Sequence, residues 1–260
     1  MKKKLKAIDR HQIAAGCISI LGFLLIWQFA VSFTAIGEIL PGPFETLIAF
    51  FRSWVDPIGR ETMGMHILWS LSRVLTGFVV ASVVGIVVGI LMGVSKVFCA
   101  IIQPLYEMIR PIPPIAWIPL IVLWFGLGEF AKYVLIFIAT FCNIVVNVYR
   151  GACTVDSVLI GAARMLGAGP VRIFFTVRLP SAVPYIFAGL QTAISVSWRT
   201  AMAAEMIRAN EGVGWIIINA QAIYDVTQML VGIIAIGITG FVLAAVMREV
   251  ERKLCAWNKV

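Results

Sequence analysis

Long apolar segments separated by short polar ones run through almost the whole chain. Six of them have the length of membrane-spanning helices, because about 20 apolar residues cross the hydrocarbon layer. They cover residues 13–33, 74–94, 101–124, 133–149, 183–207 and 230–247. The pattern predicts an all-α polytopic membrane protein with about six spans and a single transmembrane domain, residues 1–260.

Composition and charge support this prediction and orient the chain. Hydrophobic residues make up 61% of the sequence and charged residues 13%, a balance that a water-soluble chain cannot bury. A net charge of +8 would suggest a nucleic-acid partner for a soluble protein. However, about fourteen of the 21 Lys and Arg residues lie on one side of the six spans, as cytoplasmic segments do. We therefore expect cytoplasmic termini and no nucleic-acid partner.

The first apolar run follows a basic start that contains Lys2, Lys3, Lys4 and Lys6. Such a start is typical of a secretory signal as well as of a first span. The run is about twenty residues long and lacks a small-residue cleavage site, so we expect an uncleaved helix. Apolar spacing also predicts a short amphipathic helix over residues 44–54 at the outer surface, and residues 210–225 are expected to form an outer loop.

Small residues form a stripe on the second predicted span. Gly77, Ala81, Gly85, Gly89 and Gly93 recur at every fourth position, which places them on one helix face. Such a face lets another helix approach closely. The stripe predicts close helix packing and by itself indicates no contact with a substrate.

Prolines interrupt the third predicted span, at positions 104, 111, 113, 114 and 119. Each removes an amide donor, so this helix must be kinked or partly unwound. Broken backbone at membrane depth is tolerated only where protein or a water-filled cavity satisfies it. Glu107 and Arg110, just before the break, can neutralise each other. The segment is either a gate that lines a pathway or an ordinary charge pair that reaches water at the membrane interface.

Polar and charged side chains also occur inside the later spans. Asn143 and Asn147 share a helix face with Thr140 and either line a polar pathway or hold helices together. Arg199 lies deep in apolar sequence, where an ionisable residue is a functional candidate unless an ion pair explains it. The candidate pathway residues are Glu107, Arg110, Pro113, Asn143, Asn147, Ser195, Trp198, Arg199 and Glu205.

The segment between the fourth and fifth spans, residues 156–184, is polar and basic. Gly167 and Gly169 interrupt it, and Pro170 suits a first helical position, so we expect two short helices around a hinge. Arg164, Arg172 and Arg178 indicate a cytoplasmic location.

This segment resembles the cytoplasmic loop of the membrane subunits of ATP-binding-cassette importers, whose usual form is Glu-Ala-Ala followed by Gly and later by Leu-Pro. Here the corresponding residues are 161–163, Gly167 and residues 179–180, with Gly161 in place of the usual Glu. The rest of the chain is similar to permeases of the nitrate, sulfonate, taurine and bicarbonate group of type I importers. That similarity rests on residues 40–43, 70–78, 110–120, 124–126, 203–206 and 212–214 and on Trp198.

The resemblance implies a type I importer permease fold in a bacterial or archaeal cell membrane. It implies a homodimer that works with two ATP-binding subunits and an extracytoplasmic solute-binding protein, with ATP and Mg held by the ATPases and no cofactor in this chain. The loop at residues 150–182 would dock on each ATPase, where its arginines either make contacts or serve only as orientation charges. Asp156 can replace the ion pair lost at Gly161. The implied coupling residues are Ala162, Ala163, Arg164, Gly167, Ala168, Arg172, Arg178, Leu179 and Pro180.

The substrate and two rival classes remain open. Arg110 and Arg199 would favour an anion such as a sulfonate, taurine, nitrate or bicarbonate if they face the pathway, but related permeases also carry neutral vitamin precursors. A gradient-driven secondary transporter would need no ATPase-docking loop. A membrane enzyme would need a cluster of His, Asp or Cys side chains, and the Cys and His spacing forms none, nor is there a phosphate-binding glycine loop. We expect a non-catalytic permease subunit without a metal site.

Overall fold

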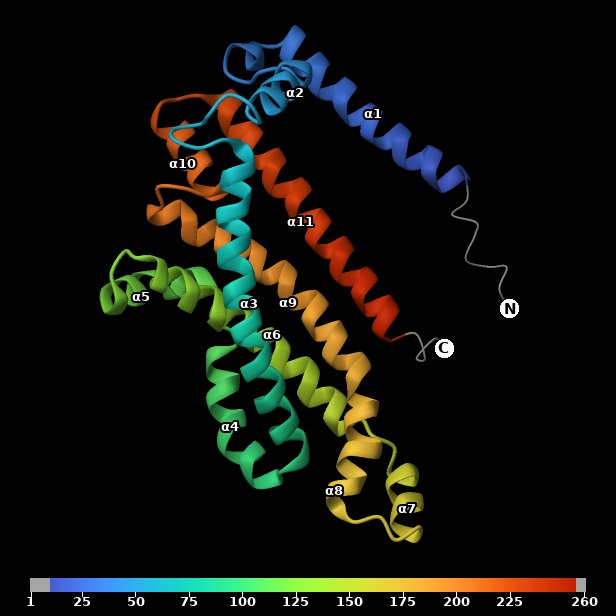
Figure 1. Ribbon diagram of the computed structural model, residues 1–260. Helices are drawn as coiled ribbons and strands as arrows, with labels where there is room; N and C mark the ends of the chain where they lie inside the picture. The colour runs from blue at the N-terminus through green and yellow to red at the C-terminus, as the bar shows by residue number, and fades with distance from the viewer. Residues whose placement is uncertain (1–9, 256–260) are drawn as a thin grey trace. The chain divides into compact units, whose positions relative to one another are not determined.

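The computed structural model describes residues 10–255 (Figure 1). All the regular elements in that range are helices, and the only β-type pairing among these residues is an isolated bridge between Ile58 and Glu61. The basic start at Lys2, Lys3, Lys4 and Lys6 lies outside the described residues. Within them, five helices are long and apolar enough to cross a membrane, and one bent helix pair makes a sixth candidate span. The prediction of an all-α protein with about six spans is confirmed.

The described chain divides into two compact units. The first combines Ile216–Ile234 with the described part of Met1–Met63. It contains α1 (Arg10–Phe33), the 3₁₀ helix η1 (Ala35–Glu38) and α2 (Pro43–Arg52). The helix α2 buries Thr46 and Phe50 and exposes Phe44 and Phe51, so the short amphipathic helix predicted here is present.

The second unit contains Gly64–Trp215 and the described part of Ala235–Val260. Three helices run from one unit into the other: α3 (Met63–Val94), α10 (Val213–Ala222) and α11 (Val226–Leu254). The others in this unit are α4 (Lys96–Ile109), η2 (Pro114–Trp117), α5 (Ile118–Phe125), α6 (Glu129–Cys153), α7 (Ser157–Met165), α8 (Pro170–Ile173), the π-helical η3 (Phe174–Arg178) and α9 (Leu179–Arg208).

Two predicted span boundaries and one predicted loop differ from the structure. The second span begins at Met63 rather than at residue 74, because the polar side chains before residue 74 are satisfied inside the protein and do not end the helix. The expected outer loop contains α10, whose Val213, Ile216 and Ala220 are fully buried. The helical run that contains the fifth span begins at Pro170, inside the expected loop, because α8, η3 and α9 follow one another without a break.

The third span is broken, as its prolines predicted. The helices before and after the break meet at an angle of 89°. Pro104 lies inside α4 without ending it, so the interruption falls at residues 110–113. Protein contacts hold both halves: the Tyr106 hydroxyl donates to the Cys142 carbonyl of α6 at 2.8 Å, and Ile121 packs against Leu135 of α6 and Ala204 of α9.

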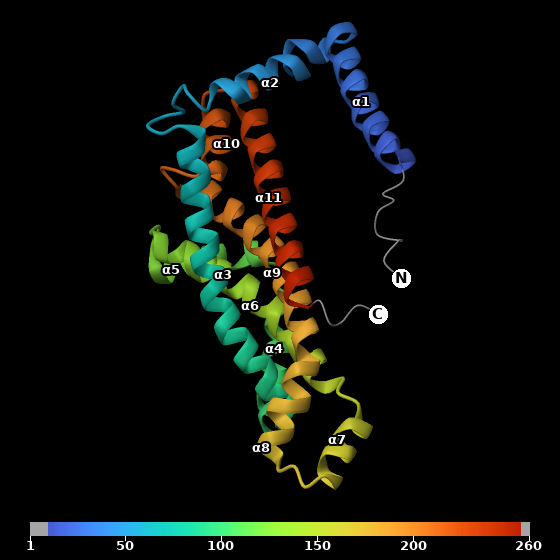
Figure 2. The same cartoon turned by 45° about the vertical axis from the view of Figure 1, so that its right-hand side comes forward.

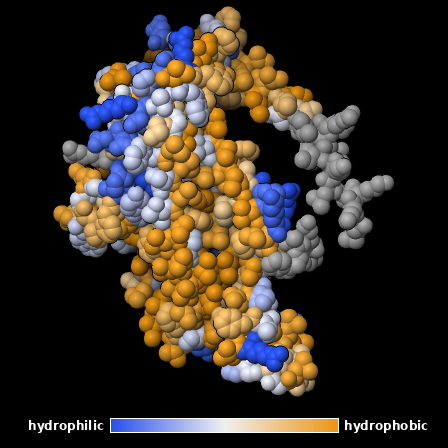
Figure 3. All heavy atoms as spheres, viewed as in Figure 1, coloured by the Kyte–Doolittle hydropathy of each residue, from blue (hydrophilic) through white to orange (hydrophobic). Residues whose placement is uncertain are grey.

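The small-residue stripe of α3 packs against α6, as its spacing predicted. A Cβ atom built on Gly77 would lie 2.6 Å from Cγ2 of Ile136, and one on Gly89 would lie 2.7 Å from Cβ of Val148. Both distances are too short for real side chains, so the two backbones approach as closely as glycine allows. On its other flank, α3 exposes large hydrophobic residues, and such residues cover much of the visible surface of the second unit (Figure 3).

Gly89→Ala is therefore expected to destabilise the second unit by about 1–2 kcal/mol, because overpacking outweighs the better helix propensity of alanine. The matched control is Gly237→Ala on α11, where a Cβ atom meets nothing within 4 Å. Thermal unfolding in one detergent measures both variants. Equal unfolding temperatures for the two variants would contradict the close α3–α6 contact.

The helices α6 and α9 lie side by side in both views (Figures 1 and 2). Their shared core contains Ile144 and Val148 of α6 and Ala182, Ile186 and Ala193 of α9. The short helices α7 and α8 lie beyond the point where α6 ends and α9 begins (Figure 2). The second unit therefore has a packed helical body with a compact loop at one end.

Candidate functional site

A cluster of charged side chains joins α3, α6 and α9 where α6 begins and α9 ends; Arg73, Lys132 and Glu205 are buried, and Glu129 is half exposed. Arg73 is 3% exposed and donates from Nε and Nη2 to the two carboxylate oxygens of Glu129, at 2.6 and 3.0 Å. Its Nη1 donates to Oε1 of Glu205 and to the Glu211 carbonyl, both at 2.9 Å. Lys132 Nζ donates to Glu129 at 2.7 Å. Two cations face two anions, so the cluster is neutral, which lowers the cost of burying these charges.

The same cluster orders the chain between α9 and α10. Glu205 Oε2 accepts hydrogen bonds from the Ser70 hydroxyl at 2.9 Å and from the Gly214 amide at 3.0 Å. The Val213 amide donates to the Ser70 hydroxyl at 2.9 Å. Gly212 has a φ of +114°, and a Cβ atom there would collide with the Glu205 carboxylate. This turn therefore requires glycine at position 212, and α3 and α9 hold it in place.

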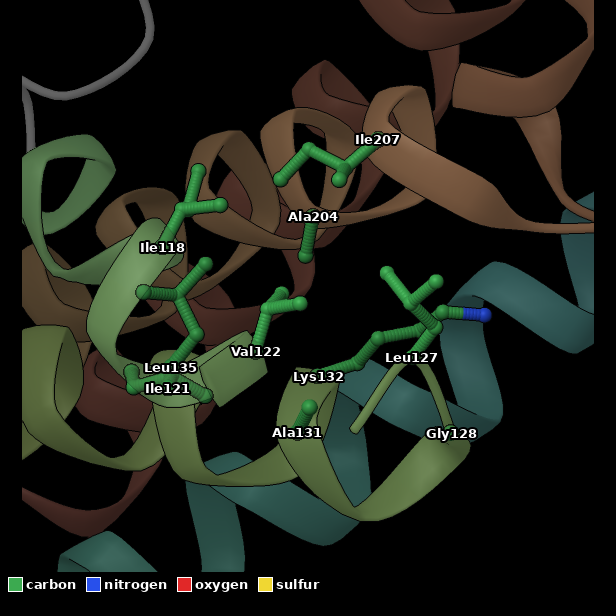
Figure 4. A pocket seen from close by; sticks show the side chains of 10 residues that line it. All are labelled: Ile118, Ile121, Val122, Leu127, Gly128, Ala131, Lys132, Leu135, Ala204 and Ile207. Carbon is green, nitrogen blue, oxygen red and sulfur yellow. The ribbon is translucent and has the colours of Figure 1, made fainter. Parts of the chain in front are cut away.

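A small apolar cavity of about 30 Å³ lies beside this cluster, among α5, α6 and α9 (Figure 4). Ile118, Leu135 and Ala204 are among the residues that line it, and the Lys132 nitrogen points away from its centre. Its volume suits a single water-sized molecule. Neither its size nor its chemistry fits a polar solute, and the described residues contain no group of three His, Cys, Asp or Glu suited to a metal ion.

Polar side chains between α6 and α9 are satisfied by partners within this chain. The buried hydroxyls of Thr140 and Ser197 lie 2.6 Å apart. Asn143 donates to the Ala139 carbonyl at 2.9 Å, and Asn147 donates to the Asn143 carbonyl at 2.8 Å. A Cβ atom on Gly189 of α9 would lie 2.9 Å from Cβ of Asn147. These contacts favour a packing role for the two asparagines over a pathway role.

One face of α9 is exposed along most of the helix. Tyr185, Thr192, Arg199 and Met206 are spaced by seven residues, so they share this face, and all four are exposed. We call them the α9 stripe. The Arg199 Nε donates to the Ser195 carbonyl of its own helix at 3.2 Å. Within residues 10–255, Arg199 forms no ion pair, so a structural pair does not explain its charge.

The remaining pathway candidates lie in different surroundings. Glu107 accepts a hydrogen bond from Gln103 at 2.7 Å, and the described chain contains no ion pair between it and Arg110. Arg110 and Pro113 are exposed at the break between α4 and η2. Trp198 is buried, and its Nε1 donates to the Ile236 carbonyl of α11 at 3.1 Å. The structure brings Glu205 into the charge cluster and leaves Arg110 and Arg199 at the surface of the second unit.

The loop between α6 and α9 exposes apolar side chains. Asp156 caps α7 by accepting from the Val158 amide at 2.8 Å. At the C-terminal end of α7, Met165 and Leu166 are 85% and 87% exposed, and Gly167 turns the chain with a φ of +77°. The predicted coupling residues Ala162, Ala163, Ala168, Arg178 and Leu179 are half-buried, whereas Arg164, Gly167, Arg172 and Pro180 are exposed.

Sequence reasoning missed most members of the charge cluster. It named Glu205 but not Ser70, Arg73, Glu129 or Lys132. A usable signal was present, because Arg73 and Glu205 are oppositely charged residues in apolar surroundings, where ionisable side chains usually pair. The structure brings residues 70–73 together with residues 203–206 and 212–214, which lie far along the sequence from them.

Comparison with known proteins matches residues 81–254 to the family described as binding-protein-dependent transport system inner membrane component. The taurine transport system permease protein TauC of Escherichia coli strain K12 is 33% identical over 95% of this chain and 90% of its own length. The nitrate import permease protein NrtB of a Synechocystis species is 33% identical over 93% of this chain and 89% of its own. A solved inward-facing structure of the MetNI methionine ABC transporter has a TM-score of 0.64 at 21% identity, covering 74% of this chain and 95% of that one.

Proposed function

Because the chain belongs to the family of binding-protein-dependent transport system inner membrane components, we propose that it is the permease subunit of an ATP-driven importer. Its partners would be a second copy of itself, two ATPase subunits that hold ATP and Mg, and an extracytoplasmic solute-binding protein. The family makes the chain a multi-pass inner membrane protein and indicates no enzymatic activity for it. Transport would proceed by alternating access, driven by the ATPases.

The observation that carries this proposal is the exposed apolar end of α7. Met165 and Leu166 lie on a loop that the charge pattern assigns to the cytoplasm, yet each is more than four-fifths exposed. Exposed apolar patches with polar surroundings mark protein interaction sites. Arg164 and Arg172 are exposed on the same loop and are suited to carboxylates on an ATPase. The loop would thus transmit ATPase closure to α9, because α8, η3 and α9 follow one another without a break from Pro170 onwards.

The α9 stripe supports assembly of two copies around a central pathway. Arg199 lies nine residues before the end of α9 at Arg208, which is about 14 Å along the helix and close to half the thickness of a hydrocarbon layer. A guanidinium exposed to lipid at this depth is costly. Burial of the stripe by a second copy around an aqueous pathway removes this cost.

The same arginine favours an anionic substrate. Guanidinium groups bind sulfonate, nitrate and carboxylate oxygens with charge-assisted hydrogen bonds. The related TauC and NrtB proteins are named for taurine and nitrate, whose sulfonate and nitrate groups share this chemistry. We therefore assign a small oxyanion to this chain, with a neutral vitamin precursor and a gradient-driven mechanism as the alternatives.

The decisive experiment compares Leu166→Glu with the wild-type chain in proteoliposomes that contain the cognate ATPase and binding protein. Leu166 is exposed, so the new carboxylate can be hydrated and the fold should persist. Copurification of the ATPase and ATP-dependent uptake of taurine or nitrate should be lost. Val55→Glu is the matched control, because Val55 is 78% exposed and lies outside the loop; it should retain the ATPase. Uptake that persists without any ATPase would instead indicate a gradient-driven carrier.

A further inference from the structure

Arg178 lies between two cavities at the loop end of the second unit. One cavity, of about 430 Å³, is lined by the ends of α3 and α6, by α4 and by Arg178. The other, of about 390 Å³, is lined by Arg164, Arg178 and the start of α8. We call the first one the α3–α4–α6 pocket. Arg178 is the one residue that lines both cavities.

Arg178 is half-buried and its charge is uncompensated. Within residues 10–255 it forms no ion pair and no side-chain hydrogen bond. Lys96 lines the same pocket from the first turn of α4, and neither cavity is lined by Asp or Glu. Gln103 and Tyr149 add polar groups to the wall. A partly buried cation without a counter-charge is unfavourable, so the pocket has the chemistry of an anion site.

The position of the pocket identifies its ligand as part of the membrane. Its walls include the last residues of two spans, Met92 on α3 and Cys153 on α6. At the ends of spans, acyl chains give way to headgroups. Beside the residues of α4 that line the pocket, the same helix exposes a row of apolar side chains. They are Val97, Ile101, Leu105 and Met108, which are 57–72% exposed. An anion held at Lys96 and Arg178 can therefore continue into acyl chains along α4.

We infer that the α3–α4–α6 pocket binds the phosphate of an anionic phospholipid of the inner leaflet, through Lys96 and Arg178. Basic pockets between membrane helices on the cytoplasmic side commonly hold such headgroups. The site goes beyond the proposed transport function and uses only the cytoplasmic orientation of the loop. A bound lipid would join the ends of α3, α4 and α6 to the segment that leads into α9, next to the loop proposed to contact the ATPase.

The test is native mass spectrometry of the full chain after extraction with phosphatidylglycerol and phosphatidylcholine in equal amounts. The wild type should retain phosphatidylglycerol preferentially, and Lys96→Gln and Arg178→Gln should each lower retention roughly tenfold, the effect of losing one charge-assisted contact. Lys253→Gln is the control, because Lys253 is an exposed cation of α11 that lines neither cavity. Thermal unfolding confirms that each variant is folded, and the exposed position of Lys96 makes it a safe second variant.

Equal retention of the two lipids, or unchanged retention in both pocket variants, would overturn the inference. Glycerol 3-phosphate separates a lipid from a soluble phosphate: if it displaces phosphatidylglycerol at comparable concentration, the acyl chains contribute nothing and the lipid assignment is wrong. The readout needs neither ATPase nor transport, so it distinguishes failure of this site from failure of the proposed function.

Discussion

Arg73→Met is expected to lower the free energy of unfolding by about 3–5 kcal/mol, the usual cost of removing one partner from a buried ion pair. The substitution leaves Glu205, which is 1% exposed, without its cation. Glu129 still forms its ion pair with Lys132 and is half exposed, so the loss of Arg73 destabilises this carboxylate less. Chemical or thermal unfolding in a single detergent measures the loss.

A second substitution makes this prediction sharper. In Arg73→Met with Glu205→Met, no buried charge is left alone, so part of the lost stability should return. Recovery should be incomplete, because the Ser70 hydroxyl and the Gly214 amide then lose their acceptor. Arg252→Met is the control, since its ion pair with Glu249 is exposed on both sides and should contribute less than about 1 kcal/mol. If Arg73→Met unfolds like this control, the cluster does not hold the helices together.

Arg199→Gln is expected to reduce uptake of an oxyanion substrate about 10- to 100-fold in kcat/KM, because one charge-assisted contact is worth about 1.5–3 kcal/mol. The Arg199 side chain is exposed and donates a hydrogen bond only to its own helix, so the stability of the fold should hardly change. Initial uptake rates at several substrate concentrations in proteoliposomes give the measurement.

The matched control for Arg199 is Thr192→Val on the same exposed face of α9. It keeps the side-chain volume and all charges, so any effect on oxyanion uptake should be much smaller. Arg199→Lys should recover part of the activity, since the charge remains but the planar fork is lost. Normal uptake in Arg199→Gln would exclude this side chain from the pathway.

Hydropathy and turn chemistry predicted the parts of this fold that depend on local sequence. The small-residue face of α3, the break after Arg110 and the hinge at Gly167 each follow from residue types with narrow backbone or steric properties. The helix α10 is too short to span a membrane and lies between polar turns. The segment is therefore predicted from the sequence as part of an outer loop, and the helix is missed.

The charge cluster could not be derived in the same way. Arg73, Glu129 and Glu205 are separated by 56 to 132 positions in the sequence, and periodicity carries no information about which distant side chains meet. Glu129 at the start of α6 is also explained by the preference of acidic residues for helix N-termini. Its ion pair with Arg73 is revealed only by the structure, in which α3 packs against α6.

The broken third span also constrains how the chain enters the membrane. At 1.5 Å per residue, the 14 residues of α4 and the eight of α5 measure about 21 and 12 Å, and a hydrocarbon layer is about 30 Å thick. Neither piece can cross alone, and irregular backbone such as that of the bend does not occur in contact with lipid at membrane depth. Tyr106 and Ile121 attach both pieces to α6, which is synthesised later. We therefore expect the third span to pack against α6 as it enters the membrane, so that its insertion and its tertiary packing occur together.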